Sequence, residues 1–195
     1  MKFLDVLLGR TKPKQANLDA LFSLSGAAIT LEAALGMKSS GEGAVCFKPA
    51  SGAGFAATAD ELTQLLELAV RESGSTLRVA DDRFGYRWVV IGDPDLEDLV
   101  TSVHMANSTL QESGFGPQLL CSVFGFAGGQ GAPGSEQRCY LVYLYKRGTF
   151  YPFAPLDGER RDNELELRVR GALEGELPIE PELSRWFALW GIPID

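Results

Sequence analysis

The chain contains very few residues of the kinds that form metal sites or nucleophilic catalytic sites. Among its 195 residues there is one histidine, His104, and there are three cysteines, Cys46, Cys121 and Cys139. A structural zinc ion is usually held by four closely spaced cysteine or histidine side chains, and no such spacing occurs here. The sequence therefore predicts no bound metal.

The small number of cysteines also excludes a disulfide framework, because an odd number without regular spacing does not form one. Each cysteine lies in an apolar stretch, and these stretches read AVCF, LLCSVF and CYLVY. We expect three buried, reduced thiols that behave as small hydrophobic side chains.

Motifs for covalent catalysis and phosphate binding are missing as well. There is no G-x-S-x-G elbow and no G-x-x-x-x-G-K-[ST] loop. Residues 129–134 read GQGAPG and match G-x-G-x-x-G, but they lead into a polar loop and a strand instead of a helix. A dinucleotide site needs its glycines to open a helix that faces the pyrophosphate, so we expect a hairpin loop and no cofactor.

One catalytic hypothesis remains, in which His104 activates Cys46 or Cys121, because such partners need not be adjacent in sequence. No local signature supports this pair, and the spacing of His104 is typical of a boundary position on a helix. We therefore predict that the protein is not an enzyme.

Long apolar runs are absent from the sequence too. No segment reaches the roughly 20 apolar residues of a membrane-spanning helix, and Asp5 and Arg10 interrupt the first apolar stretch. With no signal peptide expected, we predict a cytoplasmic protein. The net charge of −8 and the pI near 4.8 give a surface that repels phosphate backbones, so we expect no nucleic-acid partner.

The N-terminal segment differs in charge from the rest of the chain, because residues 1–14 hold four basic residues and one acidic residue. We predict an amphipathic helix over residues 2–10 and a linker over 11–16. The residues that would contact an anionic membrane or a partner helix are Phe3, Leu4, Leu7, Leu8 and Arg10. Eight residues bury little surface, so weak peripheral contact and packing on the protein's own domain both remain open.

The remaining sequence alternates between strand and helix patterns without an internal repeat. We expect a single α+β domain over residues 1–195, with helices packed against an antiparallel or mixed sheet of about five to seven strands. Strands are expected within 43–48, 76–79, 86–91, 119–126, 139–145 and 149–153, and helices within 17–24, 58–74, 93–114 and 163–173, with a last helix starting at 181. In residues 139–145 both sets of alternate side chains are apolar, which predicts a strand that is covered on both faces.

Two segments fit the patterns of both a helix and a strand. Residues 27–35 fit a helix or a strand, and we favour a strand. Residues 163–173 fit both, but acid-before-base pairs four residues apart favour a helix with Asp162 as N-cap. In that helix Glu164 and Glu166 should face solvent. We also expect Asp93 to be the N-cap of the long helix, and Thr58 and Glu61 to form a capping box.

A group of basic and aromatic residues, which we call the basic-aromatic cluster, is the strongest candidate for partner binding. It consists of Lys146, Arg147, Phe150, Tyr151, Phe153, Arg160 and Arg161. Arginine and aromatic side chains together could grip an acidic or phosphorylated partner. The alternative is that the aromatic rings cover the core while the arginines pair with Asp157, Glu159 or Asp162.

Several segments resemble the PspA-associated protein PspAB family, in order along nearly the whole chain. They include FLDVLLGR (3–10), AAITLEAALG (27–36), GFGPQLLCSVFGF (114–126), LVYLYKRGTFYPFAPL (141–156) and GERRDNELELRVRG (158–171). Residues 141–171 carry the most specific part of this resemblance, and residues 48–93 carry the least.

The resemblance implies a cytoplasmic, mainly actinobacterial accessory protein of the phage-shock response, in which PspA protects a stressed membrane. It also implies an association with a membrane metalloprotease of the HtpX type. The family brings no assigned catalytic residues. We therefore expect a non-enzymatic adaptor of the envelope-stress response that binds PspA or another membrane-associated partner. The alternatives are a chaperone-like α+β homodimer that holds a client protein, and a hydrolase built on the cysteine–histidine pair described above.

Overall fold

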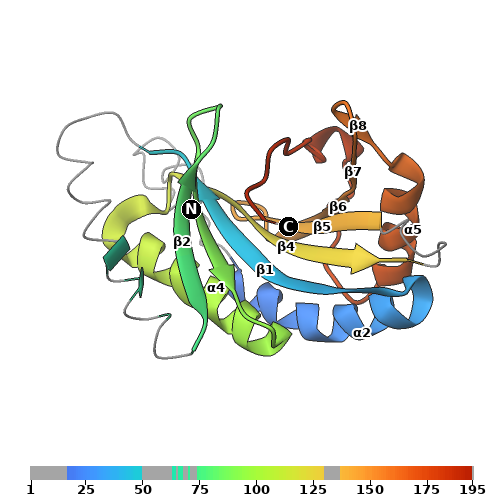
Figure 1. The fold of residues 1–195 in the computed structure, drawn as a ribbon, viewed down its shortest axis with the longest axis horizontal. Helices are drawn as coiled ribbons and strands as arrows, with labels where there is room; N and C mark the ends of the chain where they lie inside the picture. The colour runs from blue at the N-terminus through green and yellow to red at the C-terminus, as the bar shows by residue number, and fades with distance from the viewer. Residues whose placement is uncertain are drawn as a thin grey trace, which may run out of the picture.

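The main element of the fold is an antiparallel sheet. The computed structural model describes residues 17–49, 63, 64, 66, 67, 70, 74–129 and 137–194. The six strands of the sheet lie in the order β2-β3-β1-β4-β5-β6 (Figure 1). They are β1 (Met37–Phe47), β2 (Thr76–Asp81), β3 (Arg87–Gly92), β4 (Leu119–Gly128), β5 (Gln137–Leu144) and β6 (Thr149–Phe153). A second sheet pairs β7 (Pro155–Leu156) with β8 (Arg160–Arg161). The predicted α+β class and the expected number of strands are confirmed.

The helices gather on one side of the large sheet. They are α2 (Leu24–Leu35), α4 (Leu96–Leu110) and α5 (Asn163–Leu173), with short turns at η1 (Leu18–Ser23), η2 (Gln111–Phe115) and η3 (Leu183–Arg185). Figure 1 shows α2 and α4 running along one face of the sheet, with α5 beside α2 near β6. We call the face that these helices cover the helical face.

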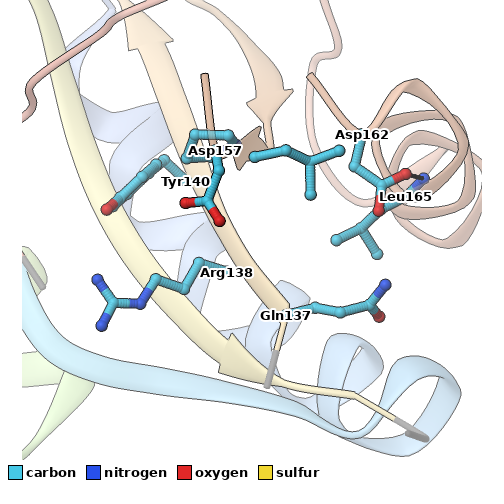
Figure 2. A pocket seen from close by; sticks show the side chains of 8 residues that line it. Gln137, Arg138, Tyr140, Asp157, Asp162 and Leu165 are labelled. Carbon is cyan, nitrogen blue, oxygen red and sulfur yellow. Dashed lines mark hydrogen bonds between the residues drawn. The ribbon is translucent and has the colours of Figure 1, made fainter. Parts of the chain in front are cut away.

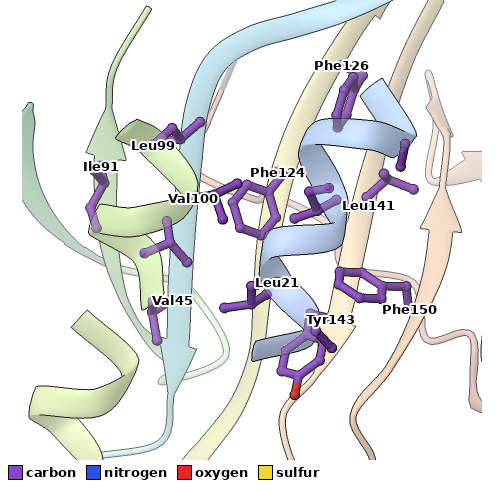
Figure 3. Packing of buried hydrophobic residues seen from close by; sticks show 14 of the residues in the cluster. Leu21, Val45, Ile91, Leu99, Val100, Phe124, Phe126, Leu141, Tyr143 and Phe150 are labelled. Carbon is purple, nitrogen blue, oxygen red and sulfur yellow. The ribbon is translucent and has the colours of Figure 1, made fainter. Parts of the chain in front are cut away.

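Alternation along each strand divides the buried residues into two clusters, because successive side chains point to opposite faces of a sheet. The cluster on the helical face includes Val45, Ile91, Phe124, Leu141 and Phe150 (Figure 3). The residues next to these along each strand point to the other face and form the second cluster, which includes Ala44, Val90, Val123 and Val142. The sheet is therefore apolar on both sides, and β5 is covered on both faces as predicted.

Residues 186–194 cover the second face, which we call the C-terminal face. This segment carries no helix or strand assignment, and Trp186 and Ile194 pack in the second cluster. Four side chains donate hydrogen bonds to its carbonyl oxygens: Tyr151 to Phe187 (3.0 Å), Tyr140 to Ile194 (3.2 Å), Arg161 to Trp186 (2.5 Å) and Arg78 to Pro193. Side chains therefore provide donors that a neighbouring strand would otherwise supply.

The strand expected at 27–35 is wrong, because these residues belong to helix α2. The buried residues of this helix, Leu24, Ala27, Leu31 and Leu35, are three or four positions apart and so share one helical side. Ile29, which suggested alternation with Leu31, is 72% exposed. The helix ends at Gly36, whose φ of 69° suits a left-handed cap.

The predicted start of the long helix is also wrong by two positions. Asp95 is the N-cap of α4, and its carboxylate accepts hydrogen bonds from the amides of Glu97 (2.8 Å) and Asp98 (3.2 Å). Asp93 is buried instead, where it accepts a 2.7 Å hydrogen bond from the hydroxyl of Ser75. Its position beside the sheet explains why it is not available as the cap.

At the C-terminal end, one helix is confirmed and another is not. Helix α5 spans the residues where competing patterns were present, and Asp162 caps it by accepting a 3.0 Å hydrogen bond from the amide of Leu165. The helix expected from Pro181 is wrong, because only the short turn η3 forms. Trp186 is buried, and the chain then extends over the sheet, so burial of its apolar side chains overrides the local helical pattern.

Some predictions fall on residues outside the described part of the chain. They are the amphipathic helix at 2–10 with Phe3, Leu4, Leu7, Leu8 and Arg10, the linker at 11–16, the capping box of Thr58 and Glu61, and most of the glycine-rich loop. They remain predictions.

The cap of α4 gives a stability prediction. Replacing Asp95 with alanine should lower the free energy of unfolding by about 0.5–2 kcal/mol, because the amides of the first turn lose their acceptor. Asp95→Asn retains an acceptor at the same position and should cost much less. Urea unfolding of both variants tests this, and equal losses in the two variants would contradict the assigned cap.

Candidate partner-binding site

The aromatic members of the basic-aromatic cluster lie in strand β6 and are buried. Phe150 and Phe153 are 0% exposed and Tyr151 is 1% exposed. Phe150 packs on the helical face, while the other two lie on the C-terminal face. The expectation that these rings present an exposed binding surface needs correction: they cover the core, as the alternative interpretation held, and Tyr151 also lines the groove described below.

Arg147 of the same cluster pairs with a buried carboxylate. Glu180 is fully buried, and it accepts hydrogen bonds from Arg147 (Nε, 2.5 Å) and from the hydroxyl of Thr149 (2.9 Å). Burial alone would raise the pKa of Glu180, but these hydrogen bonds outweigh it and hold the pKa below its ordinary value of 4.5. This ion pair fixes the segment before η3 to the turn between β5 and β6.

Arg161 makes a second buried ion pair, with Glu166. The carboxylate of Glu166 accepts from Arg161 (2.9 Å) and from the amide of Ala154 (2.9 Å). Glu166 is 3% exposed, so the expectation that it faces solvent is wrong. The guanidinium also lies 5.2 Å from the ring centre of Phe153 and donates to the carbonyl of Trp186. Arg161 thus joins β6, α5 and the C-terminal segment.

Two members of the cluster lie at the surface without pairing with a buried carboxylate. Lys146 and Arg160 are both exposed, and Arg160 donates to the carbonyl of Asp157 at 3.0 Å. The acids that the sequence suggested as arginine partners were local ones, whereas Arg147 and Arg161 reach Glu180 and Glu166. Arg147 and Arg161 therefore neutralise buried carboxylates, although the side chain of Arg147 is itself 42% exposed.

A groove on the C-terminal face has the properties of a binding site, and we call it the aromatic groove. It has a volume of about 550 Å³ and lies between the β2–β3 hairpin and the C-terminal segment. Its lining includes Cys46, Asp82, Phe84, Tyr86, Trp88, Leu120, Cys121, Leu144, Tyr151 and residues 187–190. Phe84 is 51% exposed and Phe187 is 58% exposed, so two large rings lie partly in solvent beside an apolar lining.

The hairpin residues of the groove are held in place by Asp82. Its carboxylate accepts hydrogen bonds from the amides of Phe84 (2.8 Å) and Tyr86 (2.9 Å), and from the indole of Trp88 (2.9 Å). Burial would raise the pKa of Asp82, but these donors lower it overall, so the carboxylate stays ionised. The sequence predicted a strand on each side of this turn, yet nothing local to it indicated that Phe187 would line the same groove.

A second, more polar pocket of about 430 Å³ lies between β5 and the β7–β8 hairpin. Figure 2 shows Arg138, Tyr140 and Asp157 at one end of this pocket, and Gln137, Asp162 and Leu165 at the other. Asp162 is already engaged as the cap of α5. We assign no ligand to this pocket.

The cysteine–histidine hypothesis does not match the arrangement. His104 lies on α4, its ring 4.9 Å from that of Phe22, whereas Cys46 and Cys121 pack on the opposite, C-terminal face of the sheet. The ring of His104 is partly exposed, as expected for a boundary position. Among the described residues, no cluster of three or more acidic, cysteine or histidine side chains could hold a metal ion.

One helical stretch bears on the question of membrane contact. Contrary to the expectation that no segment is long enough, Leu18–Leu35 could cross a membrane by its length and composition alone. In the structure, Leu21, Leu24, Ala27 and Leu31 of this stretch are buried in the cluster on the helical face. One side of this stretch, which comprises η1 and α2, therefore packs on the core, and 33% of the stretch is buried.

The neighbouring arginines of β8 make a matched pair for a test of stability. Arg161→Ala should destabilise the fold by about 3–5 kcal/mol, because it leaves the carboxylate of Glu166 buried without its counter-charge. Arg160→Ala removes an exposed side chain and should change stability by less than about 0.5 kcal/mol. Chemical denaturation measures both, and similar effects would show that the buried pair contributes little.

The lowered pKa of Glu180 gives a pH prediction. As pH falls below 4.5, the unfolded chain binds a proton at Glu180 before the folded chain does, so stability should fall as pH approaches the lower folded pKa. Glu180→Gln should be less stable than the wild type at neutral pH but should lose less stability on acidification. Urea unfolding between pH 3 and pH 7 tests this, and parallel pH profiles for the two proteins would contradict it.

Comparison with known proteins identifies the family of this chain. No curated protein and no solved structure matches the chain. The family model described as PspA associated protein B matches residues 1–194. Because this match spans almost every residue, the resemblance seen in the sequence is confirmed, and the chain belongs to the PspAB family.

Proposed function

We propose that this protein is a non-enzymatic accessory protein that binds PspA, and that the aromatic groove is the contact surface. The family description links the protein to PspA. The contact surface is assigned from two half-exposed aromatic rings, those of Phe84 and Phe187, beside an apolar lining. A soluble surface seldom leaves large aromatic residues exposed around a cavity unless a ligand or partner covers them.

The character of the groove supports a protein partner. Interfaces derive most of their binding energy from a few aromatic or arginine anchors that lose water on contact. Phe84 is held by the fixed turn around Asp82, and the carbonyl of Phe187 accepts a hydrogen bond from Tyr151. Both residues are therefore partly ordered before binding, which lowers the entropy that association costs. An apolar patch on PspA would suit this surface.

Lys146 and Arg160 provide a second, weaker basis for contact. They are exposed members of the basic-aromatic cluster, and they could add charge-assisted contacts to acidic residues of the same partner. Because exposed ion pairs contribute little, the groove should dominate the affinity.

Co-sedimentation with anionic liposomes, with and without added PspA, tests the partner. The protein should sediment only when PspA is present, because it would reach the membrane surface through PspA. Sedimentation with lipid alone would favour direct membrane contact by the N-terminal segment. No sedimentation in either mixture would contradict PspA binding.

Substitutions in the groove test the surface. Phe84→Ser and Phe187→Ser should each weaken binding to purified PspA by about 10-fold or more, because each removes an aromatic anchor. Ile29→Ser is the matched control: it removes an apolar side chain that is 72% exposed on α2, and it should bind like the wild type.

A charge-reversal variant separates the two surfaces. Lys146→Glu combined with Arg160→Glu should retain most of the affinity, with a stronger effect at low salt than at high salt. Isothermal titration calorimetry with PspA measures all of these variants after circular dichroism has shown that they are folded. Loss of binding in the charge-reversal variant, together with normal binding in the two phenylalanine variants, would move the site to the basic-aromatic cluster.

A further inference from the structure

The floor of the aromatic groove contains two cysteines that face each other. Cys46 of β1 and Cys121 of β4 are direct partners in the antiparallel register. Both belong to the cluster on the C-terminal face, and both line the groove. They are 2% and 5% exposed, so the groove is the route by which a small molecule would reach them.

The geometry of the pair suits a bond between the two sulfur atoms. Opposite residues in an antiparallel sheet have Cα atoms about 4.5–5.5 Å apart, which lies within the range of roughly 4.4–6.8 Å found in disulfides. The two side chains lie on the same face of the sheet and directly opposite each other, since both belong to the second cluster and are register partners. No movement of the backbone between distant elements is required.

Cys139 provides an internal comparison. It is equally buried, at 2% exposure, but it lies on the helical face and is not part of the groove. Its thiol is directed to the carbonyl of Tyr140 at 3.8 Å. Burial in a β-strand is therefore common to all three cysteines, while a directly opposite cysteine and access from the groove belong to Cys46 and Cys121.

We propose that Cys46 and Cys121 are a redox-active dithiol, which a small disulfide that enters the aromatic groove converts into an intramolecular disulfide. One cysteine attacks the small disulfide as its thiolate, forms a mixed disulfide and releases one small thiol. The other cysteine then attacks the protein sulfur of that bond and releases the second small thiol. The two cysteines are oxidised, the small disulfide is reduced, and its two thiols carry away the two protons.

The surroundings set the conditions for this exchange. The hydrogen bond with Cys121, and after it burial, raises the pKa of the Cys46 thiol. Because only a thiolate attacks a disulfide, the exchange should be slow near neutral pH and should accelerate as pH rises. The inference does not depend on PspA binding and can be tested on the protein alone.

The experiment uses the folded wild-type protein with hydroxyethyl disulfide, a small uncharged disulfide. After incubation, free thiols are blocked with N-ethylmaleimide in denaturant, and the peptides are mapped by mass spectrometry without reduction. A linked peptide pair containing Cys46 and Cys121, with Cys139 found alkylated, is the expected result. The oxidised protein should also unfold at a temperature higher by roughly 5–10 °C, because the new bond constrains the unfolded chain.

Two variants make the result specific. In Cys46→Ala, the remaining thiol should stop at a mixed disulfide on Cys121, which would show that the groove admits the reagent. Cys139→Ala should form the same linked pair as the wild type. The proposal is overturned if no linked pair forms while circular dichroism shows a folded protein, or if Cys139 is linked as often as the other two, since that would indicate exchange through unfolding.

Discussion

Within the described residues, the sheet is apolar on both faces but is covered by helices on only one, and the rest of the structure depends on this constraint. Leaving side chains such as Val90, Val123 and Val142 in water would forfeit the hydrophobic free energy of a complete layer, about 25 cal/mol for each Å² exposed. The C-terminal segment covers this face instead. Because the segment is irregular, its carbonyl groups need donors, and the hydroxyls of Tyr140 and Tyr151 supply two of them.

The same constraint explains the buried charges. Glu166 and Glu180 lie where the segments around β6 meet, and each is compensated by an arginine that a purely local view would place in solvent. Buried carboxylates without such partners would be strongly destabilising. Two of the four positive charges of the basic-aromatic cluster, those of Arg147 and Arg161, are thus paired with carboxylates inside the protein. The aromatic groove lies beside the same C-terminal segment. This segment therefore both covers the second face of the sheet and forms part of the proposed binding surface.

Much of the fold could be predicted from local patterns, while most of the candidate site could not. Continuous apolar runs identified β4 and β5, because each strand is buried on both of its faces over many residues. Alternation failed at residues 27–35, where Ile29 and Leu31 suggested a strand although one side chain is exposed and the other is buried. The groove depends on Phe84 and Phe187, which are far apart in sequence and line the same groove because the C-terminal segment packs over the sheet.

The sequence by itself determined the α+β class, the confirmed strands, the cap of α5 at Asp162 and the membership of the PspAB family. These features depend on residues that are neighbours along the chain, so short patterns are enough to reveal them. Only the tertiary structure decided which rings are buried, which arginines are paired and that Cys46 lies opposite Cys121. Those outcomes follow from strand register and from long-range packing, where free energy depends on neighbours that the linear sequence does not specify.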